Sequence, residues 1–118
     1  MIESPKTAFL VEDESLLLMM LEQTMMDLGY EVGATASSVA GGLEALAGPA
    51  KYDVAVLDVN LAGDQSFPLA RKLLERRIPV VFVTGYGRRG IPEEFGDCPV
   101  LQKPYTTAIM ERALRELA

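Results

Sequence analysis

The sequence predicts an α/β fold in which a doubly wound, five-stranded parallel sheet lies between two layers of helices. Short β-type runs alternate with amphipathic stretches along the 118 residues, and strands that alternate with helices form parallel sheets covered on both faces. Right-handed crossovers then give a three-layer α/β/α sandwich. The length suits one domain with one core.

The first two strands flank the first helix. Residues 7–11 form a short apolar run that is typical of a strand. Residues 15–28 carry apolar side chains at helical spacing, and Gly29 follows as the expected C-cap. Residues 31–36 are interpreted as the second strand.

The middle of the chain supplies a second helix and a buried strand. Ser37 or Ser38 suits the N-cap of this helix, because a serine hydroxyl accepts a hydrogen bond from the first turn. The helix is expected to end near Ala47, at the Gly-Pro pair that follows. Residues 53–57 form a run of the buried-strand type, which ends at Asp58.

The last third contains two further strands, two helices and one irregular stretch. Residues 67–77 and 106–117 are predicted to be helical, and residues 78–84 and 100–102 to be strands. Residues 85–97 contain four glycines and a proline, which are unfavourable inside a helix. We therefore expect an irregular fourth helix there, and about five helices in all.

The binding site of a doubly wound fold lies beyond the carboxyl ends of its strands. Carboxylates follow the predicted first and third strands, a hydroxyl ends the fourth, and an ammonium group follows the fifth. The sequence therefore predicts that one rim of the sheet gathers Glu12, Asp13, Glu14, Asp58, Thr84 and Lys103.

Composition excludes several kinds of chemistry. The absence of histidine rules out Ser-His-Asp and Cys-His catalysis and the common zinc sites. The net charge of -6 argues against non-specific nucleic-acid binding, and the many carboxylates favour a hard cation such as magnesium or calcium. A lone cysteine, the lack of a long apolar run and the lack of a signal-peptide pattern over residues 1–7 favour a cytoplasmic location.

Four short motifs stand at these strand ends in chain order. They are Val11-Glu12-Asp13-Glu14, Leu57-Asp58-Val59-Asn60, Val83-Thr84-Gly85 and Lys103-Pro104. Together they resemble the CheY-like response regulator receiver family over residues 6–117, and this resemblance implies a flavodoxin-like arrangement of the sheet. We expect residues 1–118 to be a single receiver domain without an output domain.

The resemblance implies a role for each site residue. Asp58 would be the phosphoacceptor, Thr84 would hydrogen-bond the phosphoryl group, and Lys103 would pair with it, carried on a cis Lys103–Pro104 bond. The expected cofactor is Mg²⁺, and its implied ligands are Glu12 (directly or through water), Asp13, Asp58 and the backbone carbonyl of Asn60.

Elementary electrostatics agrees with these roles. A carboxylate repels an anionic phosphoryl group, so a divalent ion that neutralises charge and orients the reactants is needed.

Each residue also has a plainer interpretation when it is taken alone. Asp13 or Glu14 would favour a helix N-terminus, Asp58 would sit in a turn, and Lys103 would be a surface lysine. Only their joint placement on one rim favours the phosphorylation site.

A narrower resemblance covers residues 82–87 and the Lys-Pro-Tyr run that ends at Tyr105. These segments are similar to the single-domain FAT GUY receivers, which are associated with histidine kinases of the HWE and related classes. One position departs from the wider family: Val100 stands where receivers usually carry an aromatic ring that moves inward with the threonine. Tyr86 or Tyr105 would replace that ring, or both would simply be partly exposed packing residues.

The function expected from the sequence is a two-component phosphorylation switch that receives its phosphoryl group from a histidine kinase or a histidine phosphotransfer protein. Enzymatic activity would be limited to magnesium-dependent self-phosphorylation and self-dephosphorylation. A haloacid-dehalogenase-type enzyme would need a second aspartate where Asn60 stands, and a degenerate receiver that only binds would lack a complete site. Output would pass through a protein partner or consist of draining phosphate from the kinase.

Two surfaces carry further expectations. The helix over 15–28 is apolar all round, so its outer face, where we expect Leu18 and Met19, would either dock the phosphodonor or be deeply buried. The segment 85–96 is expected to be mobile until phosphorylation orders it. We expect a monomer or weak dimer that binds neither nucleic acid nor membrane.

Overall fold

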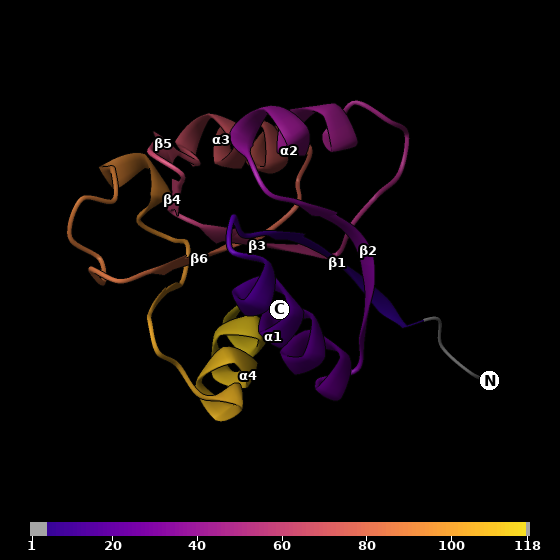
Figure 1. Ribbon diagram of the computed structural model, residues 1–118, viewed down its shortest axis with the longest axis vertical. Helices are drawn as coiled ribbons and strands as arrows, with labels where there is room; N and C mark the ends of the chain where they lie inside the picture. The colour runs from indigo at the N-terminus through magenta and orange to yellow at the C-terminus, as the bar shows by residue number, and fades with distance from the viewer. Residues whose placement is uncertain (1–4, 118) are drawn as a thin grey trace.

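The computed structural model describes residues 5–117 and confirms the predicted three-layer fold (Figure 1). Residues 1–4, which belong to the stretch that lacks a signal-peptide pattern, lie outside the described residues. Every strand of the main sheet pairs in parallel with its neighbour, in the order β2-β1-β3-β6-β7. The strands are β1 (Lys6–Val11), β2 (Tyr30–Ala36), β3 (Val54–Asp58), β6 (Val80–Thr84) and β7 (Val100–Gln102).

Four α-helices cover the two faces of the sheet. One face carries α1 (Ser15–Asp27) and α4 (Thr107–Glu116), and the other carries α2 (Val39–Leu46) and α3 (Phe67–Glu75), as Figure 1 shows. The expected count of about five helices is corrected, because the Gly-rich stretch between β6 and β7 forms only a short 3₁₀ turn at Glu93–Phe95. None of the helices within residues 5–117 combines the length and the apolar character needed to cross a membrane.

The capping residues act largely as the sequence indicates. Of the two candidate serines, Ser38 caps α2, and its Oγ accepts a hydrogen bond from the backbone N–H of Gly41 at 2.9 Å. Gly29 has φ 92°, the left-handed conformation that ends a helix and that glycine adopts without strain. The helix bounds therefore fall within two residues of those predicted.

Two apolar cores lie on opposite faces of the sheet. The core under α1 and α4 is built from alternate residues of β1, β3 and β6 together with Leu21, Met25 and Met110. The core under α2 and α3 uses the other residues of the same strands and holds a cluster of three rings, Phe67, Phe82 and Phe95. Because β3 and β6 are buried on both faces, their last side chains are fixed in position.

A small hairpin follows β3 and was not predicted. It consists of β4 (Asn60–Leu61) and β5 (Asp64–Gln65), which pair in antiparallel fashion. The two residues between them, Ala62 and Gly63, have φ angles of 52° and 96°. A two-residue turn with both φ values positive joins strands with the native twist, although alanine rarely adopts this conformation. The hairpin lies directly beside the carboxyl end of β3.

Candidate functional site

The predicted site residues meet at one edge of the sheet because their strands are adjacent. The order β1-β3-β6-β7 places four carboxyl ends side by side. Asp58 is the last residue of β3, Thr84 is the last residue of β6, and Lys103 directly follows β7. The sequence-based prediction of one polar rim is therefore correct for these strands.

Three carboxylates form a compact cluster on this rim. One oxygen each from Glu12, Asp13 and Asp58 lies within 4.8 Å of the others. Glu12 and Asp58 are buried, at 5% and 8% exposure, whereas Asp13 is half-buried. Glu14 does not join the cluster: it is exposed, occupies the N-cap position of α1, and donates its backbone N–H to Glu12 Oε2.

Lys103 is the cation of this site. Its Nζ lies 2.9 Å from Glu12 Oε1 and 3.1 Å from Asp58 Oδ2, so one ammonium group bridges two buried carboxylates. Burial acts to lower the pKa of Lys103, but the hydrogen bonds to Glu12 and Asp58 outweigh it, and the net pKa is raised. Lys103 is therefore positively charged in the resting site. The Lys103–Pro104 peptide bond is cis, as the resemblance implied.

Thr84 is buried beside this ion pair at 5% exposure. Its Oγ1 accepts a hydrogen bond from the backbone N–H of Tyr86 at 3.2 Å, and its carbonyl accepts the N–H of Lys103 at 2.8 Å. In the parallel pairing of β3 with β6, Asp58 stands opposite Val83, one residue before Thr84. The threonine hydroxyl is thus held at the end of β6, the strand that pairs with β3.

The unpredicted hairpin holds the exposed side of the acidic cluster. Asp13 Oδ2 accepts the backbone N–H of Ala62 at 3.2 Å. Asn60 Oδ1 accepts the N–H of Gly63 at 3.1 Å, so the Asn60 side chain stabilises the turn rather than pointing at the cluster. The adjacent Ala-Gly turn pair is the only sequence signal that could have indicated this hairpin.

The donor set of the rim fits a hard divalent cation. Three carboxylates offer oxygen atoms as ligands. The backbone carbonyl of Asn60, two residues after Asp58, is a further candidate oxygen ligand. Magnesium and calcium prefer oxygen ligands of this kind. Three carboxylates beside a single ammonium group leave an excess of negative charge, which a cation would neutralise.

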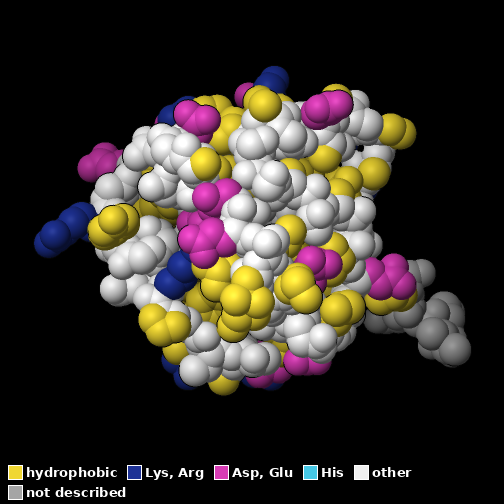
Figure 2. Space-filling model, in the orientation of Figure 1, with side chains coloured by type: hydrophobic (Ala, Val, Ile, Leu, Met, Phe, Trp, Pro, Cys, Tyr) yellow, Lys and Arg dark blue, Asp and Glu magenta, His cyan; other side chains and the backbone are white. Residues whose placement is uncertain are grey.

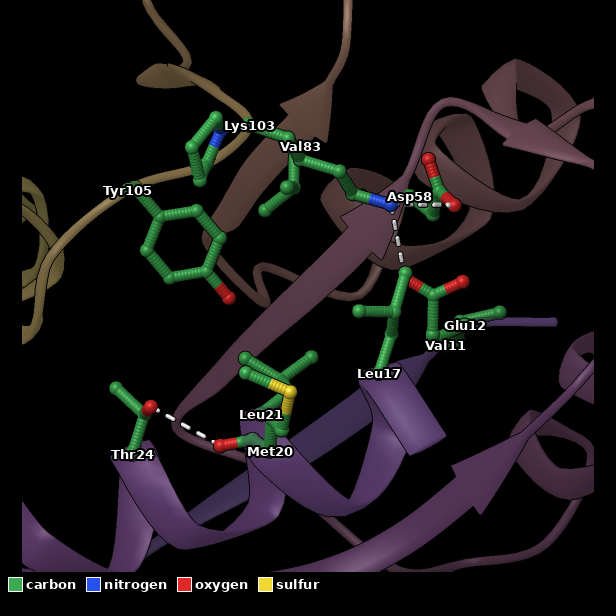
Figure 3. Close-up of a pocket in the computed structure, with 11 residues that line it drawn as sticks. Val11, Glu12, Leu17, Met20, Leu21, Thr24, Asp58, Val83, Lys103 and Tyr105 are labelled. Atoms are coloured by element: carbon green, nitrogen blue, oxygen red, sulfur yellow. Dashed lines mark hydrogen bonds and ion pairs between the residues drawn. The ribbon is translucent and has the colours of Figure 1, made fainter. Parts of the chain in front are cut away.

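A cavity of about 350 Å³ opens beside Asp58. Figure 3 shows the residues that line it. It lies between α1 and the segment after β7, with Leu17, Met20 and Tyr105 on its apolar sides and Asp58 and Lys103 at its polar end. Burial raises the pKa of the Tyr105 phenol, with the nearby charges of the site as smaller influences. The cavity connects the apolar surface of α1 to the charged cluster.

The two tyrosines that could replace the missing aromatic ring are placed differently. Val100 is half-buried and packs against the core beneath α3. Tyr86 is 77% exposed, whereas Tyr105 is half-buried against the core beneath α1 and α4. In this structure Tyr86 is therefore the exposed ring of the two, and Tyr105 packs against the core.

Comparison with known proteins agrees with this geometry. The response regulator receiver domain family matches residues 8–114. The chain is 29% identical over 118 residues to the transcriptional regulatory protein PdtaR of Mycobacterium tuberculosis, with 97% of this chain and 57% of PdtaR covered. The chain thus spans little more than half the length of this curated relative.

Solved structures show the same fold at higher identity. The solution structure of SdrG from Sphingomonas melonis Fr1 is 39% identical, with a TM-score of 0.84 and 98% of each chain covered. A solution structure of the BeF3-activated conformation of SdrG, from Pseudomonas melonis Fr1, is 38% identical, with a TM-score of 0.80 and 98% of each chain covered. The chain belongs to the response regulator receiver domain family, whose members accept phosphoryl groups in two-component signalling.

Proposed function

We propose that this chain is a phosphorylation switch in which Asp58 accepts the phosphoryl group. The observation that carries the proposal is the environment of Asp58, which ends a strand buried on both faces and points into a rim that also holds Lys103 and Glu12. A buried carboxylate paired with a cation is fixed in direction and shielded from bulk water. These are the conditions that an in-line attack on phosphorus requires.

The proposed reaction moves one phosphoryl group from a histidine nitrogen of the donor to a carboxylate oxygen of Asp58. An Asp58 carboxylate oxygen forms a bond to phosphorus while the donor's P–N bond breaks, and the donor histidine nitrogen retains the bonding electron pair. Negative charge then spreads over the phosphoryl oxygens. Lys103 already lies 3.1 Å from Asp58 and would follow this charge, while the Thr84 hydroxyl would donate a hydrogen bond to it.

Magnesium is the cofactor that we infer for this step. Asp13, Asp58 and the Asn60 carbonyl would hold the ion, with Glu12 acting directly or through water. The ion, when bound, would neutralise charge on the phosphoryl oxygens and align them with Asp58. Asp13→Asn should weaken Mg²⁺ binding in a calorimetric titration, whereas Asp27→Asn, an exposed change on the same loop-helix unit, should not. Equal affinities in the two variants would remove Asp13 from the site.

The phosphodonor is proposed to be a histidine kinase or a histidine phosphotransfer protein that docks on α1. Leu16, Met19 and Met20 lie three and four residues apart, share one face of the helix and are 67%, 64% and 58% exposed. We call these three residues the α1 docking face. Leu18 does not belong to it, because its side chain is half-buried against the core beneath α1. The expectation that Leu18 lies on the outer face is corrected.

We also propose a subfamily, a kinase class, a location and an oligomeric state for this protein. The run over residues 82–87 and the Lys-Pro-Tyr run that ends at Tyr105 support a receiver of the FAT GUY group, and a kinase of the HWE class is the proposed donor. Such a receiver would act from the cytoplasm through a protein partner or as a phosphate sink. Catalysis would be limited to its own phosphorylation and dephosphorylation, and the protein would be a monomer or weak dimer.

The central experiment uses intact-mass spectrometry. The protein is incubated with Mg²⁺ and acetyl phosphate and is expected to gain one phosphoryl group, which chelation of the metal prevents. Asp58→Ala should gain none, while Asp53→Ala, an exposed change just before the same strand, should behave as wild type. A phosphoryl adduct on Asp58→Ala would contradict the proposal.

A further inference from the structure

The methionines of this protein fall into two groups. Among residues 5–117, Met25 and Met110 are fully buried in the core beneath α1 and α4. Met19, Met20 and Met26 instead lie on the outside of α1, with exposures of 64%, 58% and 50%. Large apolar side chains are seldom exposed in such density on one helix, so this surface has a use outside the core.

One of the exposed methionines lies beside the proposed phosphorylation site. Met20 lines the cavity whose polar end is formed by Asp58 and Lys103, and its sulfur is visible there in Figure 3. Met19 adjoins it on the α1 docking face. Figure 2 shows hydrophobic side chains gathered on this face of the molecule, immediately beside acidic and basic groups. A partner that reaches Asp58 across α1 would cover both thioethers.

Methionine differs from leucine in one chemical respect at such a surface. Its thioether sulfur is oxidised by two electrons when a peroxide delivers an oxygen atom: the S=O bond forms, the O–O bond breaks, and the remaining peroxide oxygen leaves as water. The product, methionine sulfoxide, is polar and is reduced again by dedicated reductases. A polar S=O group buried in an apolar contact without a hydrogen-bond partner opposes association.

Among residues 5–117, the sulfur atoms that lie away from the exposed surface of α1 are shielded from this chemistry. Met25 and Met110 have no exposed surface. Cys98 is buried at 7% exposure, and burial raises the pKa of its thiol, which keeps the reactive thiolate scarce. Within residues 5–117, oxidation by peroxide is therefore directed to the exterior of α1.

We propose that Met19 and Met20 form a reversible oxidation site that switches off phosphoryl transfer from the protein donor. The inference rests on the proposed function, in which the donor docks on α1. Peroxide-class oxidants would convert the α1 docking face from apolar to polar while leaving Asp58, Lys103 and the acidic cluster intact. The protein would then lose its kinase input and retain its chemistry with small phosphodonors.

The test compares two phosphodonors before and after oxidation. The kinase is the one that labels the wild-type protein fastest among the histidine kinases of the source organism, and the small donor is acetyl phosphate. After hydrogen peroxide treatment, with sulfoxides located by peptide mass spectrometry, transfer from the kinase should slow by at least about tenfold. Labelling by acetyl phosphate should keep its rate, and methionine sulfoxide reductase should restore the kinase reaction.

Matched variants assign the effect to particular sulfur atoms. Each variant's rate after oxidation is divided by its own rate before oxidation. Met19→Leu/Met20→Leu cannot take up oxygen at the docking face, so this ratio should stay near one. Met26→Leu removes the exposed methionine further along α1 and should remain as sensitive as wild type. Protection by Met26→Leu alone, or equal sensitivity of all three proteins, would overturn the proposal.

A further variant separates this inference from the proposed function. Met19→Glu places a charge on the docking face and should slow transfer from the kinase without any oxidant. If Met19→Glu transfers normally, the docking of the donor on α1 is wrong. If Met19→Glu is slow but oxidised wild-type protein transfers normally, the docking face stands and the oxidation site is wrong.

Discussion

The ammonium group of Lys103 lies 3.1 Å from Asp58 Oδ2 and 2.9 Å from Glu12 Oε1, so the carboxylate that we propose as the phosphoryl acceptor is ion-paired in this structure. This lysine neutralises part of the charge that three clustered carboxylates create. It also competes with a divalent ion for the same oxygens. Most of the expected behaviour of the site follows from this one bridge.

Replacing Lys103 with methionine should therefore separate metal binding from phosphorylation. Lys103→Met removes one positive charge next to the metal site, and Mg²⁺ should bind about tenfold more tightly, which corresponds to about 1.4 kcal/mol. Phosphorylation by acetyl phosphate should become slower, because the cation that follows the developing charge is missing. Calorimetry and intact-mass time courses measure the two effects, and weaker Mg²⁺ binding by the variant would contradict this account of the bridge.

The same bridge predicts a pH dependence of stability. Because the folded state raises the pKa of Lys103 above its ordinary value of 10.5, the stabilisation from the ion pairs is complete at lower pH and is lost as the pH rises through the folded pKa. The difference in unfolding free energy between wild type and Lys103→Met should stay constant from neutral pH to about pH 9 and shrink above 10.5. Denaturant titrations at each pH check this, and a difference that grows with pH would contradict it.

The hairpin beside the site should contribute to metal affinity. The Asn60 side chain stabilises the turn through the N–H of Gly63, and the preceding N–H, from Ala62, is donated to Asp13. Asn60→Ala should therefore lower Mg²⁺ affinity about two- to fivefold, as expected for the loss of one modest hydrogen bond. Gln65→Ala, an exposed change in the same hairpin, serves as the control. Unchanged affinity in Asn60→Ala would show that the hairpin does not orient Asp13.

The segment after β6 should be mobile over only part of the predicted range. Phe95 is 1% exposed within the ring cluster, Arg71 stacks on it and pairs with Glu94, and the N–H of Cys98 bonds to the Phe95 carbonyl. We therefore expect fast amide hydrogen exchange over residues 85–92 before phosphorylation, and protection at Phe95 and Cys98. Exchange in the first stretch as slow as in β3 would exclude an order–disorder switch there.

The sequence allowed the sheet and its site to be predicted because each depends on local signals. Unbroken apolar runs mark the buried strands, and the polar residue that ends each run marks the rim. Adjacent parallel strands then bring Asp58, Thr84 and Lys103 together without further information. The cap residues Ser38 and Thr106 likewise act within one helical turn.

The features that were missed depend on contacts between distant residues. The burial of Phe95 arises from Phe67 and Phe82 on other elements, and nothing in its Gly-rich surroundings indicates it. The hairpin after β3 places Ala62 at a positive φ angle that the residue type disfavours. The half-buried position of Leu18 follows from the packing of α1 on the sheet, because a helix that is apolar all round does not indicate which face turns inward.

The most direct test of the central claim is to locate the phosphoryl group. The protein is phosphorylated with acetyl phosphate and Mg²⁺, the acyl phosphate is reduced with borohydride to leave a stable mark, and the marked residue is identified by peptide mass spectrometry. The account predicts the mark at Asp58 alone. A mark at Asp13, at Glu12 or at any residue away from this rim would contradict it.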